Sequence, residues 1–346
     1  MSEGVVAFRC NSGPLTGFGH LMRSRELARM LAARGWSAVM YGPPLNQRRE
    51  TDQTLFLDWR PAPEALARAD EPAAFIAFCE HSNAAHAIMD DYRVERDYQR
   101  RLREAGVRFL HQFDASAPPE GFWADLIVNA NPYETPDRYQ TLLEAPKADL
   151  MLGPEFAVLR PEFIAAEKPA ADRPARRVLL TFGGGDDRGL ILKFAGALRG
   201  LMAIDVISGA GNPRNAENQA ALAELDDANV ALHINPPDVA SLMRRADLAV
   251  MAGGTSTYEA AHCGVPMILL AISENQERPC MGWSDRTGAI YLGRHDAVST
   301  EQARDTVAQL AENRERRADM AARNMTLVDG KGGDRLLDAL LKGPGQ

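Results

Sequence analysis

Short apolar segments alternate with longer amphipathic segments along the first half of the chain. Apolar residues recur at helical spacing in HLMRSRELARMLAARG (20–35) and RDYQRRLREAG (96–106), and both segments end at glycine, which predicts two helices. Strands that alternate with helices of this length predict a parallel sheet covered on both faces. The predicted strands are VVAFR (5–9), SAVMYG (37–42), AHAIMDDY (ending at Tyr92), VRFLHQ (107–112) and DLIVNA (125–130).

The same alternation restarts in the second half, after a segment of different composition. Residues 161–176 are rich in proline, alanine and charge, which predicts a linker between domains. Helices are predicted over PDVASLMRRA (237–246) and TYEAAHCG (257–264), and from about residue 300 onward the chain is helical and polar. The predicted strands lie in RVLLTFGGGDD (177–187), AIDVIS (203–208), VALHI (230–234), DLAVMAGG (247–254) and PMILLA (266–271).

This organisation predicts an α/β protein of two Rossmann-like domains. A chain of 346 residues is long for a single hydrophobic core. We expect one domain over residues 1–160 and a second over 177–346 that includes the C-terminal helices. Because open parallel sheets bind ligands at the carboxyl ends of their strands, two such sheets are expected to face a central cleft.

Composition and charge exclude several classes of protein. A net charge of −8 argues against nucleic acid as a partner, because phosphate backbones require a basic surface, but helix N-termini can still hold a small anion. Four cysteines without a CxxC pair indicate reduced thiols and no structural zinc site. The start MSEGVVAFRC lacks the pattern of a signal peptide, and no apolar segment approaches the roughly 20 residues that span a bilayer. We therefore expect a cytoplasmic protein.

Two glycine-rich segments follow predicted strands of the second half. In TFGGGDDRG, the glycines Gly183, Gly184 and Gly185 let the backbone approach a phosphate, whereas a plain tight turn is the alternative. In MAGGTSTYEAAHCGVP, amides and hydroxyls at the helix start would meet a diphosphate, and Glu259 would accept ribose hydroxyls or stabilise the helix N-terminus. The amides and hydroxyls in this second segment belong to Gly253, Gly254, Thr255 and Ser256.

A third segment, AISENQERP, follows the predicted strand at 266–271. Its uncharged amides, Asn275 and Gln276, could donate to sugar hydroxyls or phosphate, and a helix cap is the alternative for Asn275. Neither half carries the GxGxxG fingerprint of dinucleotide enzymes, and the P-loop lysine is missing. A nicotinamide cofactor is therefore not expected.

The segment LTGFGHLMRS (15–24) places a histidine where the first strand passes to the first helix. Gly17 and Gly19 would permit a loop conformation closed to other residues and so bring the imidazole of His20 to the cleft. Histidine titrates near neutrality, so it can take a proton from water or a hydroxyl. A helix-start residue in a turn is the alternative for His20. The other six histidines show no spacing that compels a metal site, and no metal is expected.

These segments together resemble one known family. FRCNSGPLTGFGHLMRSRELA, IMDDY, VNANPYE, LGPEFAVLRPEF, LLTFGGGDD, AGGTSTYEA and ENQE run in the order found in the PseG/SpsG-like nucleotide-sugar hydrolases. These are UDP-sugar hydrolases of pseudaminic acid biosynthesis and relatives of the MurG glycosyltransferase. The resemblance covers roughly Val5 to Gly293 and implies a GT-B fold whose C-terminal domain holds UDP. It also implies that water displaces UDP from the anomeric carbon with inversion, without metal or cofactor.

The resemblance assigns roles to individual residues. It makes His20 the candidate general base. The residues expected on the sugar side are Arg9, Asn11, Gly17, Gly19, Tyr92, Asn129, Asn131 and Tyr133. The residues expected around the nucleotide are Gly183, Gly184, Gly185, Gly253, Gly254, Thr255, Ser256, Glu259, Asn275 and Gln276.

The chain departs from the family pattern at three acidic positions. These hydrolases usually carry aspartate where this chain has Asn11, D-H-Y where it reads Asp90-Asp91-Tyr92, and a paired D-D where it has Asp114-Ala115. An asparagine cannot take a proton or raise the basicity of a histidine as a carboxylate does.

Hydrolysis of a UDP-sugar is the leading hypothesis. A GT-B glycosyltransferase, in which His20 activates an acceptor hydroxyl, and a non-catalytic nucleotide-sugar binding protein are the alternatives. The sequence indicates neither the sugar nor the oligomeric state.

Overall fold

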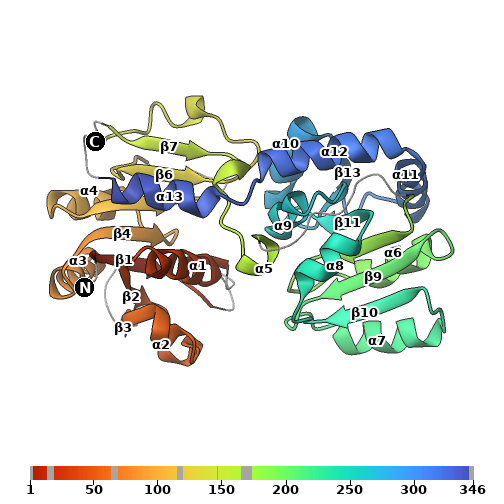
Figure 1. Ribbon diagram of the computed structural model, residues 1–346, viewed down its shortest axis with the longest axis horizontal. Coiled ribbons are helices and arrows are strands. Elements are labelled where there is room, and N and C mark those ends of the chain that lie inside the picture. The colour runs from red at the N-terminus through yellow and green to blue at the C-terminus, as the bar shows by residue number, and fades with distance from the viewer. Residues whose placement is uncertain are drawn as a thin grey trace. The chain divides into compact units, whose positions relative to one another are not determined.

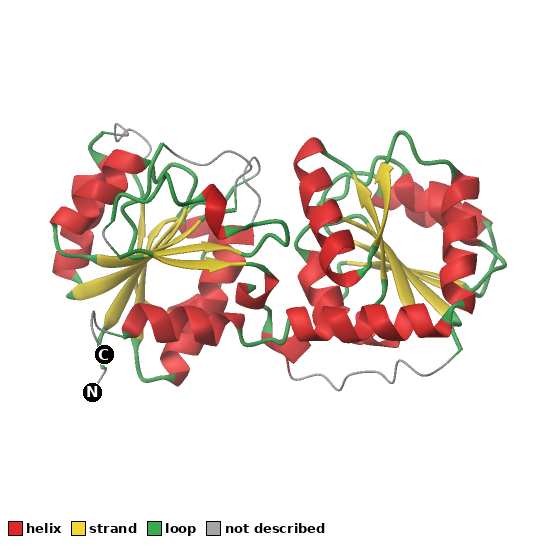
Figure 2. Ribbon diagram, turned by 90° about the horizontal axis from the view of Figure 1, so that it is seen from above, coloured by secondary structure: helices red, strands yellow, loops and turns green. Residues whose placement is uncertain are grey.

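The chain forms two compact units in a computed structural model. The structure describes residues 3–13, 19–63, 69–114, 120–145, 147–164 and 174–342. Unit 1 comprises Met1–Leu159 together with Gly330–Gln346, and unit 2 comprises Arg160–Asp329. In both units, a twisted sheet lies between layers of helices (Figure 2).

The sheet of unit 1 has seven parallel strands in the order β3-β2-β1-β4-β5-β6-β7. The carboxyl ends of β1 and β4 therefore lie side by side, near the point where the strand order reverses, which is where ligands bind in such sheets. The strands are β1 (Val5–Cys10), β2 (Ser37–Gly42), β3 (Phe56–Pro61), β4 (Ala84–Asp90), β5 (Arg108–Gln112), β6 (Leu126–Asn129) and β7 (Asp149–Leu152).

Helices cover both faces of this sheet. On one face, Leu27 of α1 and Leu336 of α13 belong to the same buried cluster as Phe8. On the other face, Phe75 of α3 and Leu102 of α4 are fully buried. The helices of unit 1 are α1 (Gly19–Ala33), α2 (Asp52–Leu55), α3 (Glu71–His81), α4 (Arg96–Glu104) and α13 (Gly332–Leu341), with 3-10 turns η1 (Leu45–Gln47), η2 (Pro136–Arg138) and η3 (Pro154–Phe156).

Unit 2 repeats this architecture with six parallel strands in the order β10-β9-β8-β11-β12-β13. The strands are β8 (Arg177–Thr181), β9 (Ala203–Ser208), β10 (Val230–Ile234), β11 (Leu248–Ala252), β12 (Met267–Ala271) and β13 (Ile290–Arg294). The helices are α5 (Pro161–Ile164), α6 (Leu190–Leu198), α7 (Asn215–Glu224), α8 (Val239–Arg245), α9 (Ser256–His262), α10 (Glu277–Thr287), α11 (Thr300–Glu312) and α12 (Arg314–Leu327), with the 3-10 turn η4 (Glu274–Gln276).

The structure confirms two α/β units with parallel sheets, and it adds strands that the hydrophobic pattern did not predict. These strands, β3, β7 and β13, all lie at sheet edges. Edge strands need no continuous apolar run, because one side of the strand faces solvent. In β7, for example, no residue is fully buried. None of the helices in the described parts of the chain is long and apolar enough to span a membrane.

The sequence analysis assigned the C-terminal helix to the second domain. In the structure this helix, α13, packs on unit 1 instead (Figure 1). Leu336, Leu337 and Leu340 are fully buried in the cluster that α1 also covers. Arg34, directly after α1, forms ion pairs of 2.7 Å with Asp334 and with Asp338. An amphipathic pattern predicts that a helix has a buried face but not which sheet that face covers. Of the predicted linker, Pro161–Ile164 form α5, and residues 165–173 lie outside the described residues.

The docking of α13 requires glycine at its first position. A Cβ at the buried Gly332 would collide with the backbone of Phe156 and Ala157, so we predict that Gly332→Ala lowers the free energy of unfolding by about 1–3 kcal/mol. The matched control is Gly196→Ala in α6, where a Cβ meets nothing within 4 Å and helix propensity predicts a stabilisation of about 0.5–1 kcal/mol. Denaturant unfolding of both variants checks this, and equal effects of the two would contradict it.

Candidate active site

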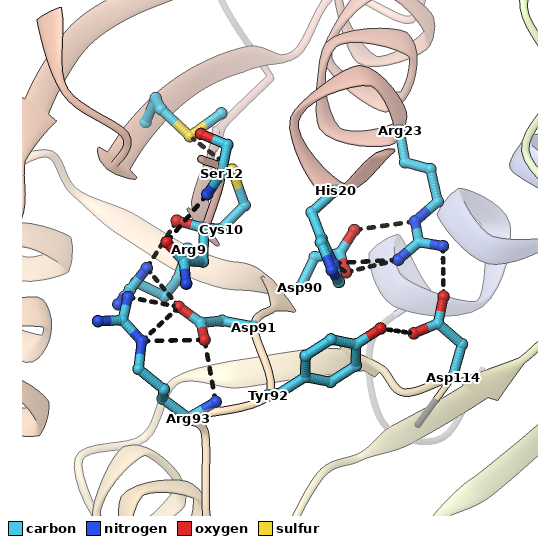
Figure 3. Close-up of polar contacts among 12 residues, drawn as sticks. Arg9, Cys10, Ser12, His20, Arg23, Asp90, Asp91, Tyr92, Arg93 and Asp114 are labelled. Atoms are coloured by element: carbon cyan, nitrogen blue, oxygen red, sulfur yellow. Dashed lines mark hydrogen bonds and ion pairs between the residues drawn. The ribbon is translucent and has the colours of Figure 1, made fainter. Parts of the chain in front are cut away.

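His20 is the second residue of α1, at the carboxyl edge of the unit 1 sheet. The helix begins at Gly19, where the backbone is outside the left-handed region and a Cβ would meet nothing within 4 Å. The special loop conformation expected at Gly19 is therefore not observed, and Gly17 lies outside the described residues. The imidazole is held in place instead by Asp90 at the end of β4, by Arg23 of α1 and by the ring of Tyr92 (Figure 3).

Asp90, at the end of β4, is the partner of His20. Its Oδ1 lies 2.5 Å from Nδ1 of the imidazole. Arg23, one turn further along α1, donates to both oxygens of the same carboxylate, from Nη2 at 2.8 Å and from Nε at 3.0 Å. Asp90 and His20 are only 2% and 5% exposed. With Nδ1 occupied by Asp90, the histidine would present Nε2 as its free nitrogen, which is the arrangement of a general base oriented by a carboxylate.

The charges of this network set the protonation of His20. Burial acts to lower the pKa of the imidazole, but the hydrogen bond and negative charge of Asp90 outweigh burial and raise it above its ordinary value of 6.5. The positive charge of Arg23 opposes this increase. Burial acts to raise the pKa of Asp90, but Arg23 and His20 outweigh it and hold that pKa far below its usual range. Asp90 is therefore a permanent carboxylate.

Asp114 and Tyr92 extend the network toward the surface. Arg23 donates from Nη1 to Asp114 at 2.6 Å, and the hydroxyl of Tyr92 donates to the other oxygen of Asp114 at 2.6 Å. Tyr92 is 49% exposed, and its ring meets the ring of His20 edge to face at 4.9 Å between centroids. Tyr92 thus combines an ordered position beside the base with a surface open to a ligand.

Arg9 has a different environment from the one that the resemblance implied. It is fully buried, and its guanidinium donates to Glu71, to the carbonyl of Cys10 at 2.6 Å and to Asp91 at 2.9 Å. Asp91 also accepts from Arg93 at 2.8 Å. With these donors engaged inside the protein, Arg9 braces the ends of β1 and β4 and offers no surface to a sugar. The assignment of Arg9 to the sugar side is therefore corrected.

The asparagines expected on the sugar side differ in their exposure to solvent. Asn129 is fully buried and binds the hydroxyl of Tyr139 at 2.9 Å and the backbone of Asn131 at 3.0 Å, so its role is structural. The side chain of Asn131 is 3.4 Å from the carbonyl of Asp114, next to the network of His20. Asn11, Asn131 and Tyr133 are partly exposed, and Oδ1 of Asn11 accepts from the amide of Ser12 at 2.9 Å.

The glycine-rich loop after β8 lies at the surface of unit 2. Gly183, at φ +95°, requires a glycine conformation, and Gly183, Gly184 and Gly185 are exposed. The next loop passes against it so closely that a Cβ at Gly209 would collide with the backbone of Gly184. This loop can therefore present backbone amides to a ligand, as its sequence predicts.

The second glycine-rich loop joins β11 to α9. A Cβ at Gly253 would collide with the sulfur of Cys280, so this glycine serves close packing as well. Thr255 is exposed, whereas Gly254 and Ser256 are partly exposed at the start of α9. Oε1 of Glu259 accepts from Nε of Arg160 at 2.8 Å, and burial raises the pKa of this carboxyl although Arg160 opposes the increase. Neither of the two roles considered for Glu259 included this ion pair.

Asn275 and Gln276 lie in η4, after β12. Oε1 of Gln276 accepts from the amide of Ile272 at 3.1 Å, and Oδ1 of Asn275 accepts from the hydroxyl of Ser273 at 2.6 Å. Beside this turn is a hollow of about 550 Å³, lined by Asp186, Arg188, Arg214, Ile272 and Ser273. Within the residues that the structure describes, no cluster of three or more histidine, cysteine or carboxylate side chains could hold a metal ion.

The sequence analysis did not assign Asp90, Arg23 or Asp114 to the site. The signal was present in part, because Arg23 lies three residues after His20, at a spacing that places both side chains on one helix face. Asp90 and Asp114 each follow an apolar strand, and neighbouring parallel strands end at the same edge. The apolar pattern alone did not show which of the two adjacent carboxylates, Asp90 or Asp91, would meet the histidine.

We predict that Asp90→Asn lowers the pKa of His20. The substitution removes the negative charge that raises this pKa, while burial and Arg23 continue to lower it. Titration of the imidazole by NMR checks the shift. Asp91→Asn is the matched control, because its carboxylate pairs with Arg9 and Arg93 instead. A pKa of His20 that is unchanged in Asp90→Asn, or lowered equally in both variants, would contradict the assignment.

Comparison with known proteins finds relatives in sequence and counterparts in fold. No family model matches the chain. It is 29% identical over 186 residues to the spore coat polysaccharide biosynthesis protein SpsG of Bacillus subtilis, covering 52% of this chain and 54% of SpsG. The match thus spans about half the length of SpsG. It is 24% identical over 273 residues to the UDP-2,4-diacetamido-2,4,6-trideoxy-beta-L-altropyranose hydrolase of Campylobacter jejuni, covering 79% of this chain and 93% of that protein.

The fold has a close counterpart among solved structures. The structure of MurG from Acinetobacter baumannii superposes with a TM-score of 0.72 at 16% sequence identity, over 98% of this chain and 99% of that one. The GT-B fold predicted from the sequence is thereby confirmed. The chain is similar in sequence to SpsG and to the altropyranose hydrolase, which confirms its resemblance to the PseG/SpsG-like proteins, and it shares the fold of MurG.

Proposed function

We propose that this protein is a nucleotide-sugar hydrolase. It would cleave the anomeric C–O bond of a UDP-linked amino or deoxy sugar and release UDP and the free sugar, in nonulosonic acid or surface-glycan biosynthesis. The observation that carries the proposal is the 2.5 Å contact between His20 and Asp90, which orients an imidazole beside the exposed Tyr92. The similarity to a protein named as a UDP-sugar hydrolase supports the reaction class.

The proposed reaction is a single displacement. A water oxygen forms a bond to the anomeric carbon from the face opposite UDP, and the bond to the phosphate oxygen breaks with its electron pair leaving on UDP. The water proton passes to Nε2 of His20, whose Nδ1–H donates to Asp90. A diphosphate is a weak base, so its departure requires fixed donors more than an acid. The sugar is released with inverted anomeric configuration.

The residues around the sugar follow from exposure and position. Tyr92, Asn131 and Tyr133 are at least partly exposed, and Tyr92 touches the ring of His20, so we assign them to the sugar. We assign Asn11 to the same set because it follows β1 at the same sheet edge. Arg9 and Asn129 are fully buried. Arg9 binds the carbonyl of Cys10, next to Asn11, and Asn129 binds the backbone of Asn131.

Unit 2 would hold the nucleotide. The exposed loop residues Gly183, Gly184 and Gly185, and the loop from Gly253 to Ser256 that leads into α9, suit a diphosphate. Glu259, fixed by Arg160 through Oε1, would accept a ribose hydroxyl with its second oxygen. Asn275 and Gln276 keep their amide nitrogens for the sugar or phosphate, because the contacts described above use their oxygens.

A glycosyltransferase is the second candidate, favoured by the similarity of fold to MurG. In that reaction His20 would take the proton of an acceptor hydroxyl rather than of water. The same base and leaving group serve both reactions, so an acceptor requirement distinguishes them.

We predict that His20→Ala and His20→Asn reduce UDP release from the preferred UDP-sugar by about 100-fold or more, because general-base catalysis contributes factors of this size. UDP release is measured across a panel of UDP-sugars, with and without a crude acceptor fraction. His81→Asn, an exposed histidine at the end of α3, is the control and should retain full activity. Release that occurs only with acceptor would indicate a transferase. Binding of a UDP-sugar without turnover under either condition would indicate a binding protein.

A further inference from the structure

We infer that Asp186 occupies the position of a phosphate oxygen, and that Arg188 and Arg214 are the side chains that bind the diphosphate. This inference rests on the proposed function and adds a charged subsite to it. The subsite is the hollow of about 550 Å³ in unit 2, which Arg188 and Arg214 both line.

The contacts of Asp186 are those that a phosphate oxygen makes. Its Oδ1 accepts from the backbone amide of Arg188 at 2.8 Å and from Nε of Arg214 at 3.2 Å. A backbone N–H and a guanidinium are the donor pair that proteins commonly direct at phosphate. The Asp186 side chain is 53% exposed, so it can move aside when a ligand enters.

The adjacent carboxylate, Asp187, has a different environment from that of Asp186. Asp187 is 2% exposed, and its oxygens accept from the amides of Gly189 at 3.3 Å and Ile191 at 3.1 Å. It therefore anchors the loop to the start of α6. Asp186, in contrast, lies at the surface and accepts from one backbone amide, that of Arg188.

Arg188 is held in a conformation that directs its amide at the same point. Its φ of +55° lies in the left-handed region, which costs free energy for a residue with a side chain and is typical of functional loops. Its Nη1 lies 3.3 Å from Nε2 of His295. An imidazole carries no negative charge, so this contact does not neutralise the guanidinium. The charge of Arg188 therefore stays available to an anion in the hollow.

Charge balance explains why Asp186 matters for binding. Arg214 pairs with Asp186, with Glu217 through Nη1 at 2.9 Å and with Asp187 at 4.0 Å, so carboxylates already surround its charge. A diphosphate that replaces Asp186 regains the amide and guanidinium donors but must push the carboxylate away. Asp186 thus competes with the ligand, and removal of its charge should strengthen binding of any diphosphate.

The test measures binding by isothermal titration calorimetry with UDP, uridine and inorganic pyrophosphate. Arg188→Gln and Arg214→Gln should each weaken UDP and pyrophosphate by roughly tenfold, the size of a charge-assisted hydrogen bond, and leave uridine within about twofold. Asp186→Asn should strengthen UDP and pyrophosphate several-fold. Arg199→Gln, which removes an arginine paired with Asp227 elsewhere on unit 2, is the control and should change none of the three.

The outcomes separate this inference from the proposed function. Unchanged pyrophosphate and UDP affinity in both arginine variants would overturn it, as would weaker binding in Asp186→Asn or no pyrophosphate binding by a wild type that binds UDP. If UDP and pyrophosphate bind with the expected changes but no UDP-sugar is hydrolysed, the subsite stands and the hydrolase proposal fails. If hydrolysis proceeds and the variants bind UDP like the wild type, the hydrolase proposal stands and the subsite inference fails.

Discussion

The candidate site depends on one buried carboxylate. Asp90 lies at the end of β4, almost excluded from water, and an isolated charge there would be costly. Two partners from α1 offset this cost, since His20 and Arg23 both bind the carboxylate. The same contact fixes the start of the helix against the sheet and orients the imidazole. The same interaction therefore stabilises the fold and positions the candidate base. Arg23 also pairs with Asp114, which in turn accepts a hydrogen bond from Tyr92.

The alternation of a β-strand explains how two adjacent acids can serve different purposes. Successive side chains of a strand point to opposite faces, so Asp90 faces α1 while Asp91, directly after β4, turns to Arg9. The acid that departs from the family pattern is thus neutralised by Arg9 and Arg93 (Figure 3). Asn11 accepts a hydrogen bond from its neighbour Ser12, and Ala115 lies outside the described residues. The carboxylate that meets the histidine, Asp90, is one that the family pattern shares.

Much of the fold could be predicted from the sequence because both sheets are parallel and buried. Central strands such as β1, β8 and β11 read as continuous apolar runs, and the glycine-rich loops follow them directly. The edge strands β3, β7 and β13 and the packing of α13 on unit 1 were not predicted, because they depend on which surfaces meet in three dimensions. The sequence singled out His20 as a candidate base but not its partners Asp90 and Arg23. The role assigned to Arg9 was wrong because a charged residue on a strand gives no sign of whether its partners are protein or ligand.

The central claim is that water, activated by His20, attacks the anomeric carbon. It is tested most directly by turnover of the preferred UDP-sugar in ¹⁸O-labelled water, with mass spectrometry of both products and NMR of the freshly released sugar. The account predicts ¹⁸O on the anomeric carbon of the sugar, unlabelled UDP, and an anomeric configuration opposite to that of the substrate. Label in the phosphate of UDP would show that the P–O bond breaks instead, and retained configuration would exclude a single displacement; either result would contradict the account.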